Sequence, residues 1–112
     1  MGLTVVGLGP GGGADLTGRA RAALEQCDLI VGYTTYLSLL EGQFPQAERF
    51  KTGMRREVER CRAAVEAAVS GREVALVCSG DAGVYGMAGL AFEVAREFPP
   101  VDIEVVPGIT AA

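Results

Sequence analysis

The sequence of 112 residues predicts an α/β fold, in which a mostly parallel sheet of five strands is flanked by helices. Two observations lead to this class. Short apolar runs rich in β-branched residues alternate along the chain with longer segments of helical period, which is typical of parallel sheets. The apolar runs are also nearly continuous, as expected for strands that are buried on both faces.

The expected strands are separated by helices or long turns. A first helix should be capped by Asp15 or Thr17 and run to about Gln26, because either side chain can accept a hydrogen bond from the first helical turn. A short helix is expected between Gly32 and Gly42. The strands are expected over residues 3–8, 29–31, 48–51, 73–78 and 101–106.

Two further helices have a clearer apolar pattern. Over residues 55–70, apolar side chains repeat with a helical period from Val58 onward, and Gly71 follows where a C-terminal glycine is favoured. Residues 84–98 are expected to form the last helix, which the proline pair at 99 and 100 should stop. The expected buried positions are Val58, Cys61, Val65, Ala68 and Val69 in the former helix, and Met87, Leu90, Val94 and Phe98 in the latter.

Composition excludes several kinds of chemistry. The chain has no histidine, which removes the Ser-His-Asp triad, the Cys-His pair and histidine metal sites. A formal charge of −4 argues against nucleic acid as a partner, and no apolar run reaches the ~18 residues of a membrane span. The three cysteines form no CxxC pair, so no metal site is expected. We expect buried, reduced thiols in a cytoplasmic protein.

Glycine is concentrated at the junctions between elements. The chain has 16 glycines, and three glycine-rich turns follow expected strands at residues 7–13, 79–86 and 107–110. Parallel sheets bind ligands at the carboxyl ends of their strands. Three such turns together predict a cleft lined by backbone, which could bind an amino-acid-like or nucleoside ligand without charged side chains.

The first turn matches the pattern G-x-G-x-x-G, which also occurs in dinucleotide sites. Two details argue against that interpretation. Pro10 removes an N–H group from the stretch that would face a pyrophosphate. Asp28 precedes the second strand, whereas the acidic residue that holds a ribose should lie near the end of that strand. A P-loop is excluded because no Gly-Lys-Ser/Thr occurs.

Two residues of the second turn allow two interpretations each. Asp81 either caps a helix that begins near Val84 or accepts a hydrogen bond from a ligand, and both roles are compatible. Tyr85 either packs in the core or lies over a ligand. The chain ends at residues 107–112 without a closing helix, which we expect to mark a domain boundary.

Three motifs, in this order, resemble those of the tetrapyrrole (corrin/porphyrin) methylases, which use S-adenosylmethionine. Within that family, the resemblance is strongest to the enzymes that methylate C-17 of precorrin-3B in cobalamin biosynthesis, a step accompanied by ring contraction. The motifs are residues 6–11 (VGLGPG), 79–81 (SGD) with Tyr85-Gly86, and 105–111 (VVPGITA). The local marks are 30–33 (IVGY) with Tyr36-Leu37, 53–55 (GMR) with Glu57, Arg60 and Cys61, and 79–89 (SGDAGVYGMAG).

The resemblance implies that residues 1–112 form the N-terminal domain of a two-domain methyltransferase whose C-terminal domain is absent. It implies a tetrapyrrole substrate, a homodimer, and S-adenosylmethionine as methyl donor in the cleft between the domains. It places the substrate against Gly9, Tyr33, Tyr36, Met54 and Arg55. It places the cofactor against Pro10, Ser79, Gly80, Asp81, Val84, Tyr85, Thr110 and Ala111.

Some alternatives stay open at this point. Uroporphyrinogen methylases tend to carry Asp where this chain has Tyr33, so no catalytic residue is assigned. Arg55, Arg56, Arg60 and Arg62 are interleaved with glutamates, which favours a solvated helix face, although a substrate rich in carboxylates could pair with Arg55, Arg56 or Lys51. The chain could also belong to another precorrin or uroporphyrinogen methylase, or be a non-catalytic fragment that binds a ligand or dimerises.

Overall fold

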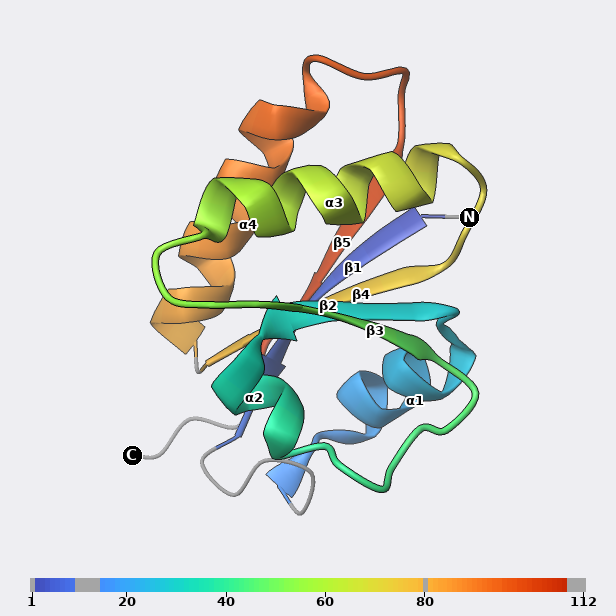
Figure 1. Ribbon diagram of the computed structural model, residues 1–112, viewed down its shortest axis with the longest axis vertical. Coiled ribbons are helices and arrows are strands. Elements are labelled where there is room, and N and C mark those ends of the chain that lie inside the picture. The colour runs from blue at the N-terminus through green and yellow to red at the C-terminus, as the bar shows by residue number, and fades with distance from the viewer. Residues whose placement is uncertain (1, 10–14, 80, 109–112) are drawn as a thin grey trace.

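The computed structural model describes residues 2–9, 15–79 and 81–108, and these residues form one sheet covered on both faces by helices (Figure 1). Every pairing between the described strands is parallel, in the order β3-β2-β4-β1-β5. The α/β class is therefore confirmed, and the sheet is fully rather than mostly parallel. The strands are β1 (Gly2–Leu8), β2 (Leu29–Tyr33), β3 (Glu48–Thr52), β4 (Val74–Ser79) and β5 (Asp102–Val106).

The helices lie in two layers. α1 (Gly18–Gln26) and α2 (Thr34–Ser38) cover one face of the sheet, and α3 (Glu57–Val69) and α4 (Asp81–Ala95) cover the other (Figure 1). Each layer has its own apolar core. Because side chains alternate along a strand, β1 serves both cores: Leu3 and Val5 pack beneath α3 and α4, whereas Val6 and Leu8 pack toward α1 and α2.

Local hydrogen bonds explain where α1 begins and where α3 ends. The hydroxyl of Thr17 accepts a 3.1 Å hydrogen bond from the amide of Ala20, so Thr17, rather than Asp15, caps α1. At the end of α3, Gly71 adopts a φ of 104° and donates its amide to Ala68, while Arg72 donates to Ala67. These paired bonds form a Schellman motif, which explains the glycine that the sequence pattern placed there.

The structure corrects the predicted buried face of α3. Val58 is 54% exposed, whereas Cys61 and Val65 are fully buried. The buried stripe consists of Arg60, Cys61, Ala64, Val65 and Ala68, so it begins at Arg60 and does not extend back to position 58. The helix itself begins at Glu57 rather than at residue 55.

The bounds of α4 also differ from those expected. The helix begins at Asp81 rather than near Val84, so Asp81 occupies a helical position instead of preceding the helix. It ends at Ala95 rather than at Phe98, because the chain tightens into turns in which Glu97 donates to Val94 and Phe98 to Ala95. Proline after Phe98 disfavours helical geometry at that residue. In the described part of the chain, no helix combines the length and the apolar character needed to cross a membrane.

Candidate functional site

The three glycine-rich turns follow three neighbouring strands. β4, β1 and β5 are adjacent and parallel, so their carboxyl ends meet at the same edge of the sheet. The register places Leu8 of β1 opposite Ser79 of β4, and Val6 of β1 opposite Val106 of β5. The turns therefore begin side by side, as predicted.

Main chains approach closely at this edge. A Cβ atom placed on Gly108, just after β5, would lie 2.9 Å from the carbonyl oxygen of Gly7 in β1. Any side chain at position 108 would force these two segments apart. Glycine thus leaves backbone groups, rather than side chains, along this part of the edge.

A hollow of about 270 Å³ opens beside the end of β4. It is bounded by the end of β2, by α2, by the turn between β3 and α3, and by the first turns of α3 and α4. Four of the residues expected on the substrate side, Tyr33, Tyr36, Met54 and Arg55, line this hollow together with Ser79. The other lining residues are Glu57, Arg60, Cys78, Gly83 and Met87.

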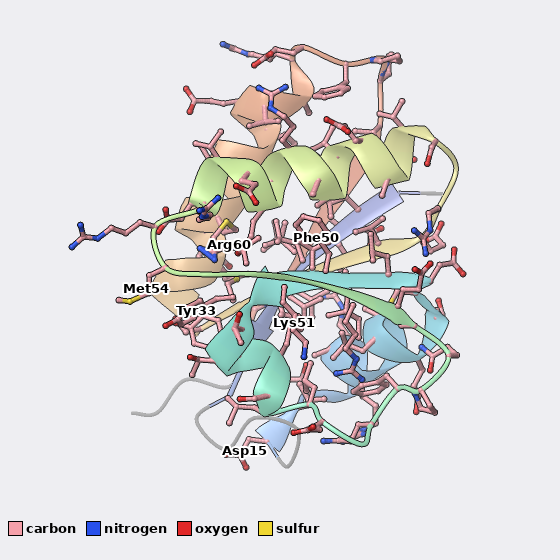
Figure 2. The ribbon with its side chains drawn as sticks, in the orientation of Figure 1. Asp15, Tyr33, Phe50, Lys51, Met54 and Arg60 are labelled. Carbon is pink, nitrogen blue, oxygen red and sulfur yellow. The ribbon has the colours of Figure 1, made fainter. Side chains whose placement is uncertain are left out.

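Aromatic rings and a guanidinium form one wall of the hollow. The rings of Tyr33 and Tyr36 meet edge to face, with centroids 5.4 Å apart and planes at 83°. The guanidinium carbon of Arg60 lies 5.8 Å from the centroid of the Tyr33 ring, within reach of a cation–π interaction. Figure 2 shows Arg60 next to Tyr33, on the same side of the molecule as Met54. An apolar platform with an adjacent positive charge suits a flat, anionic ligand.

Arg55 has an unusual backbone at the rim of the hollow. Its φ is 60°, in the left-handed region that residues other than glycine rarely adopt. Its side chain is exposed, and it lies in the turn that joins β3 to α3. Strained backbone of this kind concentrates at functional sites, where the position of a side chain matters more than its conformational cost.

The thiol beside the hollow is not a nucleophile at neutral pH. Burial raises the pKa of Cys78 to about 12, and its Sγ lies 3.6 Å from the carbonyl oxygen of Val6. Burial likewise raises the pKa of Cys61 to about 11, and that thiol contacts the sulfur of Met87 at 3.4 Å. Both thiols are therefore protonated packing groups, as the sequence pattern suggested.

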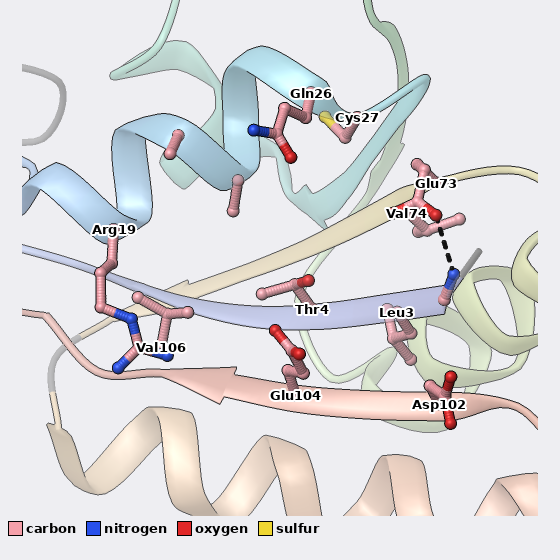
Figure 3. Close-up of a pocket in the computed structure, with 13 residues that line it drawn as sticks. Leu3, Thr4, Arg19, Gln26, Cys27, Glu73, Val74, Asp102, Glu104 and Val106 are labelled. Atoms are coloured by element: carbon pink, nitrogen blue, oxygen red, sulfur yellow. Dashed lines mark hydrogen bonds between the residues drawn. The ribbon is translucent and has the colours of Figure 1, made fainter.

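A larger hollow of about 410 Å³ lies at the opposite end of the sheet (Figure 3). It is lined by α1, by β1 and β5 and by the start of β4; Thr4 and Glu104 lie next to each other, and the Arg19 side chain reaches toward Val106. The amide of Gly2 donates a 3.2 Å hydrogen bond to Glu73 at its end. No residue expected to bind ligand lines this hollow, and ligands of open α/β sheets bind at the carboxyl ends. We therefore assign the candidate site to the smaller hollow.

The family model for the tetrapyrrole (corrin/porphyrin) methylases matches residues 2–112. The chain belongs to this family. It is 47% identical over 111 residues to a Salmonella typhimurium protein named "Probable cobalt-factor III C(17)-methyltransferase", covering 98% of this chain and 46% of that protein. The chain thus spans about half the length of this relative.

Solved structures agree with the family assignment. The crystal structure of the methyltransferase CobJ matches with a TM-score of 0.84 and 38% identity, over 97% of this chain and 46% of that one. A uroporphyrin-III C-methyl transferase from Thermus thermophilus, complexed with S-adenyl homocysteine, matches with a TM-score of 0.72 and 26% identity. That match covers 99% of this chain and 49% of the Thermus chain.

Of the remaining residues expected at the site, those that the structure describes do not line the hollow. Val84 is fully buried in the core, so only its main chain could meet a ligand, and Tyr85 is 60% exposed, which excludes the core packing considered for it. Gly9 is buried against Asp15 and does not line the hollow. Pro10, Gly80, Thr110, Ala111 and the side chain of Asp81 lie outside the described residues.

Arg60 lines the hollow, although the sequence did not predict it as a site residue. The sequence pattern favours a solvated face for the arginine cluster, and this holds for Arg56, which pairs with Glu59 at 2.8 Å on the surface. Arg60, however, is only 5% exposed and lines the hollow. Its neighbour Cys61 was already assigned to the buried stripe, and adjacent helical positions often share such a stripe. Arg60 also stands among the local marks of the family resemblance, together with Glu57 and Cys61, and this is a second signal.

Proposed function

We propose that this chain forms the first domain of an S-adenosylmethionine-dependent methyltransferase that methylates a corrin precursor at C-17 in cobalamin biosynthesis. The ring contraction associated with that step belongs to the same proposal. The observation that carries it is the hollow in which Tyr33, Tyr36, Met54, Arg55 and Ser79 meet at the carboxyl edge of the sheet. The name of the Salmonella relative supports C-17 as the position and cobalt-factor III, rather than cobalt-free precorrin-3B, as the substrate.

The backbone of the sheet edge is suited to S-adenosylmethionine. At Gly108 the main chain packs against that of Gly7, so no side chain separates the backbone after β5 from that of β1 at this edge. Main-chain groups can bind the amino-acid and nucleoside portions of a ligand that carries little net charge. Ser79 adds a hydroxyl at the end of β4, next to this edge. We infer that Ser79 and the three turns provide one wall of the cofactor site.

The hollow fits a tetrapyrrole by its chemistry. Tyr33 and Tyr36 offer ring edges and faces to a flat macrocycle, and Met54 is an exposed apolar side chain at the rim. Arg55 supplies a positive charge for the carboxylates that such a macrocycle carries. We propose these four residues as the substrate side of the site.

The reaction needs little acid or base chemistry from this chain. When bound, S-adenosylmethionine supplies a methyl group on a sulfonium, and its transfer to carbon releases a neutral thioether. The described lining residues would hold the macrocycle in line with that methyl group and exclude water. Glu57 is the only carboxylate among them, and it is half exposed at the rim, so we assign no catalytic base.

Further parts of the proposal concern the assembly. We propose that a second domain, corresponding to the remaining length of the relatives, completes the pocket, and that the complete enzyme is a homodimer. We also propose a cytoplasmic location. The three free, buried cysteines of the described chain support it, because a reducing compartment keeps thiols in this state.

A chimaera tests the proposed function directly. This chain would replace the matching 111 residues of the Salmonella relative, and transfer of a radiolabelled methyl group to cobalt-factor III would be measured. We expect methylation, with the label at C-17 by NMR of the product. The same chimaera carrying Tyr33→Ala serves as a control that should lose activity.

Two results would contradict the proposal in different ways. A folded chimaera that binds S-adenosylhomocysteine but methylates another ring carbon would indicate a different precorrin or uroporphyrinogen methylase. A folded chimaera without any methyl transfer, beside an active Salmonella enzyme, would favour a non-catalytic role for this domain.

A further inference from the structure

Arg60 is a charged residue held inside the molecule. Its side chain is 6% exposed, and its position in α3 directs it toward the end of β2. Nη1 donates a 2.8 Å hydrogen bond to the hydroxyl of Thr52 and lies 3.5 Å from the carbonyl oxygen of Gly53. The guanidinium also lies over the Tyr33 ring. These contacts fix the plane of the guanidinium at the wall of the hollow.

The contacts leave part of the guanidinium unpaired. A guanidinium carries N–H donors on Nε, Nη1 and Nη2. Within the described residues, the hydrogen bonds of Arg60 use Nη1 alone. Nη2 lies 3.8 Å from a carboxylate oxygen of Glu57, which is beyond hydrogen-bond distance, and the Glu57 side chain is 51% exposed. A buried cation with such a weak counter-ion favours a further anion.

The same cation lines the candidate substrate hollow. We propose that Arg60 binds a carboxylate of the tetrapyrrole through Nε and Nη2, and that Glu57 competes with that carboxylate for the guanidinium. This inference rests on the proposed function, since it assumes a tetrapyrrole substrate. Arg60 would act at the inner wall of the hollow, and Arg55 at its rim.

Two features favour a carboxylate as the partner. A planar guanidinium matches the two oxygens of a carboxylate and can bind both at once. Tyr33 and Tyr36 place an aromatic surface next to the cation, so a ligand that combines a flat ring with carboxylate arms would contact both. A purely structural role would need only the bonds to Thr52 and Gly53.

The test uses the chimaera of this chain with the Salmonella relative, so that the proposed second domain is present, and uroporphyrin III, a macrocycle with carboxylate side chains, as the probe. Binding would be followed by quenching of porphyrin fluorescence at pH 7.5, with circular dichroism to check folding. We expect Arg60→Met to weaken binding by at least about tenfold, as for loss of a charged hydrogen bond. We expect Glu57→Gln to tighten binding about two- to fivefold, because it removes the competing carboxylate.

Glu59→Gln is the matched control for charge. It removes one negative charge from the same helix, but Glu59 pairs with the exposed Arg56 rather than with Arg60. We expect it to leave binding nearly unchanged. The comparison of Glu57→Gln with Glu59→Gln therefore decides the proposal even if Arg60→Met fails to fold.

Each other outcome overturns the inference in a recognisable way. Equal binding by the Glu57→Gln and Glu59→Gln variants would exclude competition at Arg60. A folded Arg60→Met variant with wild-type affinity would leave Arg60 with its structural bonds alone. In both cases the chimaera without these substitutions still binds the porphyrin, and the proposed substrate class survives. Absence of binding by that folded chimaera would overturn the inference together with the substrate class.

Discussion

Arg60 donates a 2.8 Å hydrogen bond from Nη1 to the hydroxyl of Thr52, and both residues are buried. Thr52 is the last residue of β3, and its carbonyl oxygen accepts a 3.0 Å bond from the hydroxyl of Thr34 at the start of α2. One threonine thus links α2, the edge strand β3 and α3. These are the elements that bound the candidate site.

The first prediction concerns Thr52→Val, which keeps the shape of the side chain and removes the hydroxyl. The buried guanidinium then loses its shortest hydrogen bond, so we expect the free energy of unfolding to fall by about 1–3 kcal/mol. Urea unfolding followed by circular dichroism measures the change. Thr52→Ser retains the hydroxyl and should lose less stability than Thr52→Val. Equal losses in the two variants would show that the methyl group, rather than the hydrogen bond, matters at this position.

The second prediction separates stability from binding at Arg55. Because this residue holds a φ of 60°, Arg55→Gly should relieve backbone strain and raise the free energy of unfolding by about 0.5–1 kcal/mol. The same change removes a cation from the rim of the hollow and should weaken uroporphyrin binding severalfold. Arg56→Gly is the control, since Arg56 has a φ of −115° and gains no relief. A loss of stability in Arg55→Gly as large as in Arg56→Gly would contradict the strain argument.

The third prediction follows from the buried thiols. Burial raises the pKa of Cys27 and Cys61 to about 11 and that of Cys78 to about 12. Below pH 9 the thiols are protonated in both the folded and unfolded states. Between pH 9 and 11 the unfolded chain releases these protons while the folded chain retains them, so stability falls as pH rises. Each thiol contributes a slope of up to about 1.4 kcal/mol per pH unit.

Urea unfolding between pH 7 and pH 10.5 checks the effect of the thiols. The informative comparison is between the wild-type chain and Cys61→Ala, because the two chains differ at this thiol alone. We expect the variant to lose stability less steeply above pH 9 than the wild-type chain does. Parallel pH profiles would mean that Cys61 ionises similarly in the folded and unfolded states.

Most of the fold could be predicted from the sequence because its signals are local. Apolar runs located β1, β2 and β4 to within about two residues, because these inner strands are buried along most of their length. β3 and β5 lie at the edges of the sheet and have exposed polar positions, so their apolar signal is weaker. The order of the strands could not be read this way. Placing β4 between β2 and β1 depends on which helices cover which face, and that is a long-range property of packing.

The parts of the candidate site that are set by the backbone or by a motif could be predicted from the sequence. The parts that depend on where a helical side chain points were harder to predict. The turns at the ends of β4, β1 and β5 meet as expected once the strands are adjacent. The sequence pattern predicts a buried Val58 and a solvated Arg60, whereas the structure has Val58 exposed and Arg60 buried. A helical pattern alone does not say which edge of the apolar stripe meets the sheet. Arg60 is tolerated inside because Thr52, Gly53 and Tyr33 meet it there.

The last prediction compares two glycines at opposite ends of helices. Gly71 has a φ of 104° at the end of α3, where its amide bonds to Ala68, so Gly71→Ala should lower the free energy of unfolding by about 1 kcal/mol or more. Gly18 begins α1 with open space around it, so Gly18→Ala should raise stability by up to about 1 kcal/mol through better helix propensity. Both changes add one methyl group, and urea unfolding measures both. Changes of the same sign would contradict the assignment of the Schellman motif, because the two positions differ in backbone conformation and not in the group added.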